Sequence, residues 1–231
     1  NDNSKTGKIK TAAAETGVWT HQQPSTGLYE RITRGMGHLL EFAEGAGVGR
    51  FLHVGSGAMY GPVPAGVTHV PEAHPCQRAP LPADAIWAEG KRLEENLVQA
   101  HATKTGCALT IARGFAFVGP HLPLDANYAI GNFIGDALRG GPVRVKGDGT
   151  PRRSYLYAAD LAIWLWTLHL AANAHGIYNV GSDRADSIAA HARMVARVAG
   201  LSDAVEIQQA PDPARPASWY VPDISRARKE L

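Results

Sequence analysis

The segments RFLHV (residues 50–54), AIWAEGKRLEENLVQAHATK (85–104) and CALTIAR (107–113) decide the fold of this chain. The first and third are short apolar runs of the kind that form buried strands. The second places apolar residues at helical spacing and stops before Gly106. A strand, a helix and a strand in this order predict a parallel sheet of the α/β class.

The same reading extends in both directions from these segments. An amphipathic helix is expected over 28–43, a long loop over 61–83, and an unstructured polar start over Asn1–Lys8. After Pro120 the pattern predicts shorter helices and strands. We expect helices at 130–138, after a cap at Asp160, after a cap at Ser187 and from Asp223, with strands at 143–146, 153–157 and 177–180.

Composition narrows the class of protein. The chain has 231 residues, 45% of them hydrophobic, and a formal net charge of +2, so it lacks the basic footprint of a nucleic-acid binder. It contains no apolar run near the roughly 20 residues that span a membrane, and we expect neither a membrane span nor a signal peptide. Cys76 and Cys107 fit neither a disulfide framework nor a zinc pattern, and no histidine pair has metal-binding spacing. We expect a cytoplasmic protein without a metal site.

Several segments, in order over about residues 12–231, resemble the extended short-chain dehydrogenase/reductase family. In that family a strand ends in a catalytic Ser or Thr, a helix carries YxxxK, and later loops read RxFxxxGP and GDGTxxR. The matching stretches are Ala12–Gly17, Phe51–Gly61, Trp87–Arg92, Ala112–Pro120, Gly147–Ala162, Tyr178–Ser182 and Pro222–Arg228. The resemblance implies an NAD-dependent nucleotide-sugar epimerase or dehydratase.

The resemblance also implies a partial Rossmann-like fold. We expect residues 1–120 to be the remnant of a dinucleotide-binding domain and residues 121–231 to form a smaller α/β substrate-binding lobe, interleaved with the first part. Nothing before Gly27 supplies the strand, glycine-rich turn and helix that hold a pyrophosphate. The Gly55–Gly61 run follows a strand, but its spacing is wrong and prolines follow it instead of a helix.

The catalytic residues implied by the family are only partly present. Ser56 and Lys91 match, but Trp87 stands where the catalytic Tyr belongs, and an indole N–H is a donor that cannot act as a base. Tyr60 is a candidate substitute. Gly57 and Ala58 replace the Asp-Glu pair of the dehydratases, which disfavours 4,6-dehydration.

Plain structural alternatives exist for these matches. Lys91 would then be a solvated helix lysine and Ser56 a strand-end hydroxyl satisfied by backbone. Trp87 would fill the space left by an absent cofactor. Asp160 is better explained as a helix cap than as a ligand.

Binding residues also follow from the resemblance. It implies NAD or NADP in the full-length family, held by Ala13, Lys91 and Phe115, although Trp87 leaves open that this chain uses none. Arginines clamp the diphosphate of a nucleotide sugar, because a guanidinium matches phosphate oxygens bidentately. The substrate residues are therefore expected to be Asn132, Arg153 and Arg215.

Three functions remain open. The first is a nucleotide-sugar epimerase or oxidoreductase whose catalysis Trp87 impairs. The second is a cofactor-independent lyase, isomerase or cyclase that reuses the cleft, and the third is a non-catalytic binding subunit. A parallel sheet with an uncovered edge exposes apolar surface, so we also expect a homo-oligomer.

Overall fold

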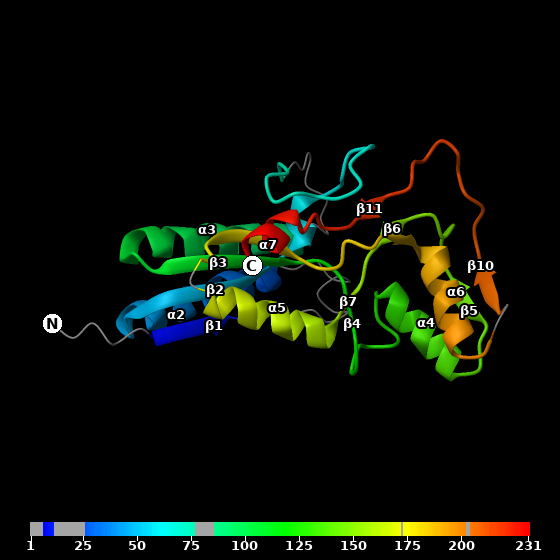
Figure 1. The fold of residues 1–231 in the computed structure, drawn as a ribbon, viewed down its shortest axis with the longest axis horizontal. Helices are drawn as coiled ribbons and strands as arrows, with labels where there is room; N and C mark the ends of the chain where they lie inside the picture. The colour runs from blue at the N-terminus through cyan, green and yellow to red at the C-terminus, as the bar shows by residue number, and fades with distance from the viewer. Residues whose placement is uncertain (1–6, 12–25, 77–85, 172, 202–203) are drawn as a thin grey trace.

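The larger sheet of the molecule is four-stranded and parallel. The computed structural model describes residues 7–11, 26–76, 86–171, 173–201 and 204–231. The strand order is β1-β2-β3-β8, built from β1 (Gly7–Thr11), β2 (Val48–Ser56), β3 (Ala108–Gly114) and β8 (Gly176–Val180). Figure 1 shows β1, β2 and β3 side by side, and β8 pairs in parallel with β3, so the predicted α/β class is confirmed.

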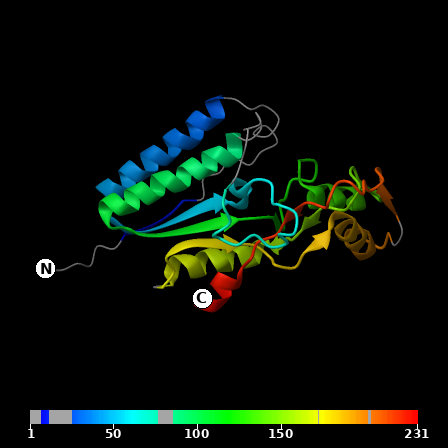
Figure 2. The ribbon, with the colours of Figure 1, turned by 90° about the horizontal axis from the view of Figure 1, so that it is seen from above.

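Helices cover both faces of this sheet (Figure 2). On one face lie α2 (Thr26–Gly45) and α3 (Ile86–Thr105), and on the other lie α5 (Ala158–Leu170) and α7 (Ser225–Glu230). Each face buries its own apolar cluster, as a sheet between two helical layers must. The first cluster contains Met36, Phe51, Val98, Leu109 and Ile111, and the second contains Leu52, Ala112, Leu168, Tyr178 and Val180.

A smaller lobe lies beyond one end of the sheet (Figure 1). It packs α4 (Ala129–Leu138) and α6 (Ile188–Val198) against the parallel pair β5 (Val143–Val145) and β10 (Val205–Ile207). Since β8 and α5 also follow residue 120 and belong to the larger sheet layer, the second half of the chain contributes to both bodies.

Short strands connect the sheet to the lobe. The first set pairs β4 (Phe117–Val118) with β7 (Leu156–Tyr157). The second places β6 (Arg152–Arg153) between β11 (Trp219–Tyr220) and β9 (Asp186–Ser187). These two-residue pairings bring distant parts of the chain to the same end of the larger sheet.

The start of the chain differs from the prediction. Gly7 and Lys8, expected to be unstructured, belong to β1, which pairs in parallel with β2. A short stretch without strong apolar alternation becomes a strand here because β2 offers a row of backbone hydrogen-bonding groups. Residues 1–6 lie outside the described residues.

The predicted caps have mixed outcomes. The Ser187 hydroxyl accepts the Ala190 N–H at 3.1 Å, so the predicted cap of α6 is confirmed. Asp160 is wrong as a cap, because α5 begins at Ala158 and Asp160 lies within its first turn. The last helix begins at Ser225, whose N–H donates to the Asp223 carboxylate at 2.8 Å.

Candidate active site

Ser56 lies at the carboxyl end of β2, where ligands commonly bind in parallel α/β sheets. It caps the short helical turn η1 (Gly57–Tyr60) and accepts the Ala58 N–H at 3.2 Å. Its hydroxyl also lies near enough to the phenol of Tyr220, a residue far along the chain, to oppose the rise in the pKa of that phenol. The predicted catalytic serine is thus at the expected edge of the sheet, with an unexpected neighbour.

Tyr220 is the centre of a group that we call the phenol cluster: Ser56, Phe115, Arg153 and Tyr220. The pairing of β11 with β6 sets Tyr220 opposite Arg153, whose guanidinium carbon is 5.9 Å from the centre of the tyrosine ring. The ring of Phe115 lies 4.7 Å away, centre to centre. Burial raises the pKa of Tyr220, against the opposing effects of Ser56 and Arg153.

Glycine at position 57 allows this packing. A Cβ on Gly57 would come within 2.8 Å of the Phe115 ring, closer than van der Waals contact permits. A Cβ on Gly181 would meet Phe115 at 3.3 Å and Pro222 at 2.8 Å. Phe115, predicted to bind cofactor, is buried in this structure and supports the tyrosine ring.

Arg153 is a half-buried cation. Its guanidinium donates to the backbone oxygens of Arg152 at 2.7 Å and Ser218 at 3.3 Å. Burial lowers its pKa, and no carboxylate of the described residues forms an ion pair with it. A half-buried guanidinium without a carboxylate partner favours an anionic ligand, because partial removal from water makes an uncompensated charge costly.

Lys91 has a different environment from the phenol cluster. Its side chain is 2% exposed, and Nζ donates to Glu94 Oε2 at 2.7 Å. The same nitrogen lies 5.1 Å from the centre of the Trp87 ring. The alternative of a solvated lysine is therefore wrong, since Lys91 is in a buried ion pair under an indole.

His53 completes this buried group. Its Nε2 is 3.6 Å from Glu94 Oε2, and neither ring nitrogen has a hydrogen-bond partner within the described part of the chain. Burial, with the nearby charge of Lys91, lowers the pKa of His53 to about 3. Burial likewise raises the pKa of Glu94, against the opposing charge of Lys91. At neutral pH the histidine is uncharged, and Glu94 is the acid that compensates Lys91.

The surroundings of Trp87 and Lys91 show whether these two residues could hold a nicotinamide cofactor. The family arrangement needs a phenol at position 87 and an available ammonium from Lys91, whereas Trp87 is a donor only and the ammonium is held by Glu94. Trp87 and Lys91, as placed, do not fit that role. Ala13, also predicted to bind cofactor, lies outside the described residues.

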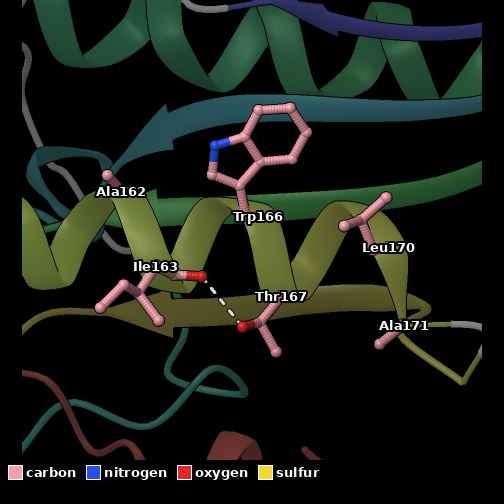
Figure 3. Close-up of a pocket in the computed structure, with 6 residues that line it drawn as sticks. All are labelled: Ala162, Ile163, Trp166, Thr167, Leu170 and Ala171. Carbon is pink, nitrogen blue, oxygen red and sulfur yellow. Dashed lines mark hydrogen bonds between the residues drawn. The ribbon is translucent and has the colours of Figure 1, made fainter.

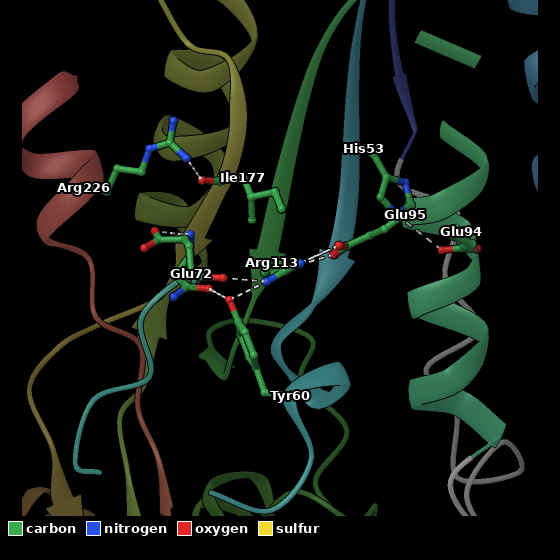
Figure 4. Close-up of polar contacts among 9 residues, drawn as sticks. His53, Tyr60, Glu72, Glu94, Glu95, Arg113, Ile177 and Arg226 are labelled. Carbon is green, nitrogen blue, oxygen red and sulfur yellow. Dashed lines mark hydrogen bonds and ion pairs between the residues drawn. The ribbon is translucent and has the colours of Figure 1, made fainter. Parts of the chain in front are cut away.

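Tyr60 is buried in a polar network rather than placed to replace the missing phenol (Figure 4). Its hydroxyl donates to Asn179 Oδ1 at 2.9 Å and accepts from Arg113 at 2.7 Å. Arg113 in turn donates to both oxygens of Glu95, at 3.0 and 2.8 Å. Burial raises the pKa of Tyr60 to about 12, and both hydrogen-bonding directions are used internally. The structure thus contradicts the prediction of Tyr60 as a substitute base.

The contacts of the other two predicted substrate residues, Arg215 and Asn132, are with residues outside the phenol cluster. Arg215 has a side chain 86% exposed and a nitrogen 3.6 Å from Asp212. Asn132 is half-buried near the start of α4, where its N–H donates to the Tyr128 oxygen. Tyr220 itself was missed, because no motif marks it and its neighbours come from distant segments.

An apolar surface pocket lies along α5 (Figure 3). It is lined by Ala162, Ile163, Trp166, Thr167, Leu170 and Ala171. Its lining includes none of the residues predicted to bind or react. Within the described residues, no cluster of three metal-ligating side chains occurs, and no helix is long and apolar enough to cross a bilayer.

Comparison with known proteins identifies the family. Residues 4–181 match the model of the NAD dependent epimerase/dehydratase family, so the chain belongs to that family. UDP-glucuronic acid decarboxylase 1 of Arabidopsis thaliana is 32% identical over 153 residues, which are 66% of this chain and 34% of that relative. The chain therefore spans about a third of the length of this curated relative.

Solved structures share the fold. The UDP-glucose 4-epimerase of Thermus thermophilus, in complex with NAD, is 24% identical with a TM-score of 0.79, over 98% of this chain and 72% of that one. The UDP-glucose 4-epimerase of Thermotoga maritima, with UDP-glucose, is 21% identical with a TM-score of 0.78, over 96% and 70%. The predicted family and fold are confirmed.

Proposed function

We propose that this chain binds a nucleotide-activated sugar and belongs to an epimerase- or oxidoreductase-type enzyme whose catalysis is impaired by Trp87. The observation that carries the proposal is the convergence of Ser56, at the end of β2, and Arg153, from β6, on the ring of Tyr220. This arrangement offers a hydroxyl for a sugar and a guanidinium for a phosphate in one place.

The parts played by the chain's own residues follow from their contacts. Arg153 would bind a phosphate of the ligand, because among the described residues it lacks a carboxylate partner. Ser56 would orient a sugar hydroxyl from the strand end. Asn132 and Arg215 remain predictions that the contacts do not support directly. The family's nicotinamide cofactor would supply hydride transfer, but Trp87 and Lys91 do not fit it, so we derive no step through it.

One observation favours a second candidate function. Lys91 is paired with Glu94 and covered by Trp87, so two of the family's three catalytic positions lack their usual chemistry. This supports a protein that binds a nucleotide sugar through Ser56 and Arg153, either without turnover or with cofactor-independent chemistry.

Calorimetric titration of the chain with UDP-glucose, UDP-glucuronic acid, dTDP-glucose and CDP-glucose tests the proposal. We expect one class to bind, and Arg153→Ala to weaken that binding at least tenfold, since hydrogen bonds to a charged group contribute about 1.5–3 kcal/mol. Arg144→Ala is the matched control, because Arg144 is exposed and pairs with Glu206 at 3.4 Å. Equal losses in both variants, or no binding by the wild type, would contradict the proposal.

The same titration with NAD separates the two candidate functions. Binding of NAD by the wild type favours the enzyme, whereas nucleotide-sugar binding without NAD binding favours the second function. Turnover gained by Trp87→Tyr would support the enzyme further, since that change returns a phenol to the helix.

A further inference from the structure

We propose that Tyr220 contacts the ligand in this site and that its hydroxyl donates a hydrogen bond to an oxygen of the bound nucleotide-activated sugar. This inference rests on the proposed function and adds to it a residue that neither the family motifs nor the sequence patterns nominate. The site would then contain a phenol from β11, Tyr220, although α3 has Trp87 where the family has a tyrosine.

The surroundings of the Tyr220 hydroxyl are the first observation. The Ala58 N–H donates to Ser56 Oγ at 3.2 Å, and the Ser56 hydroxyl lies near enough to the Tyr220 phenol to oppose the rise in its pKa. No hydrogen bond among the described residues takes the Tyr220 proton, so an oxygen of a ligand can accept it.

Packing against Phe115 and Arg153 holds the Tyr220 ring in place. Tyr220 is held on one side by Phe115, with ring centres 4.7 Å apart, and faces the Arg153 guanidinium at 5.9 Å. Phe115 can take this position because residue 57 is glycine. A ring supported in this way keeps its hydroxyl in one place before a ligand arrives, which reduces the ordering cost of binding.

Tyr60 and Tyr220 differ in how their hydroxyls are used. Both phenols are near Phe115, but Tyr60 is 1% exposed and uses its hydroxyl on Asn179 and Arg113. Tyr220 is half-buried and is close to the two residues of the proposed binding site, Ser56 and Arg153. Burial raises the pKa of Tyr220, so the phenol stays protonated at neutral pH and acts as a donor rather than as a base.

Titration of wild type, Tyr220→Phe and Tyr178→Phe with UDP-glucose and UDP-glucuronic acid tests the proposal. Phenylalanine keeps the ring that Phe115 and Arg153 contact and removes the hydroxyl alone. We expect Tyr220→Phe to raise Kd about tenfold, from the loss of a hydrogen bond contributing about 1.4 kcal/mol. The midpoint of thermal unfolding should stay near that of the wild type.

Tyr178→Phe is the matched control, because its hydroxyl donates to Glu230 at 2.6 Å, within a group between β8 and α7. It should leave Kd unchanged. If the wild type binds and the Kd of Tyr220→Phe is within twofold of the wild-type Kd, the role of Tyr220 is overturned and the proposed function still stands. No binding of any nucleotide sugar by the wild type would overturn both, and equal weakening by the two variants would also overturn the role of Tyr220.

Discussion

At the scale of single residues, Trp87 replaces the tyrosine of the family, and Lys91 is engaged by neighbours on its own helix. The ammonium pairs with Glu94 three residues later, and the indole covers it. Both charges are buried, with side chains 2% and 5% exposed. Such a pair needs both partners, since removing one leaves an uncompensated charge away from water.

We therefore expect Lys91→Met and Glu94→Leu each to destabilise the fold by about 3–5 kcal/mol, and the double variant to recover most of that loss. Urea unfolding of the four proteins measures the coupling. The exposed pair of Lys104 and Glu44, 2.7 Å apart with side chains 67% and 46% exposed, is the control and should show much weaker coupling, because water screens both charges. Similar coupling in both pairs would contradict a structural role for the buried one.

At the scale of elements, α5 and α6 begin in different ways. Ser187 accepts the Ala190 N–H at 3.1 Å and satisfies one of the free donors of the first turn of α6. The residue before α5 is Tyr157, which makes no side-chain cap, and Asp160 is inside the first turn. A sequence pattern cannot separate these cases, because both residue types favour helix starts.

Ser187→Ala should cost about 1 kcal/mol of unfolding free energy, the usual effect of losing an N-terminal cap. Asp160→Ala should cost less, because an acid in the first turn contributes only through the helix dipole, about 0.3–1 kcal/mol. Chemical denaturation followed by circular dichroism measures both. A larger loss for Asp160→Ala than for Ser187→Ala would contradict the observed caps.

At the scale of the whole molecule, one helical face presents apolar side chains to solvent. Ile163, Trp166 and Leu170 on α5 are 64%, 55% and 56% exposed, and follow one another at helical spacing. At the sheet edge, β1 pairs with β2 and with no other strand of the described residues. An exposed apolar face and an unpaired edge both favour association.

Sedimentation velocity over a range of concentrations should therefore detect species larger than the monomer. Trp166→Lys should shift the distribution toward the monomer, because it places a charge within the apolar face. Val198→Lys is the control, since Val198 is 85% exposed at the end of α6, in the smaller lobe. A wild type that sediments as a monomer at every concentration would rule out the expected homo-oligomer.

The sequence by itself determined the central strands, the longer helices and the family. Apolar periodicity predicted α3 and the strands around it, and the spaced motifs pointed to the epimerase/dehydratase family, because period and spacing are local properties of a chain. Ser56 was predicted as a site residue from the resemblance to a family motif in which a strand ends in a catalytic Ser or Thr, and Ser56 is the last residue of β2.

Only the tertiary structure decided how the side chains meet. It set Tyr220 against Ser56 and Arg153, turned Lys91 toward Glu94, and enclosed Tyr60 between Arg113 and Asn179. Apart from Lys91 and Glu94 on α3, these partners lie far apart along the chain, on elements whose mutual placement depends on how the layers pack. Local spacing predicts which residues share a helix face, but the neighbour across a buried contact is chosen by packing and charge compensation.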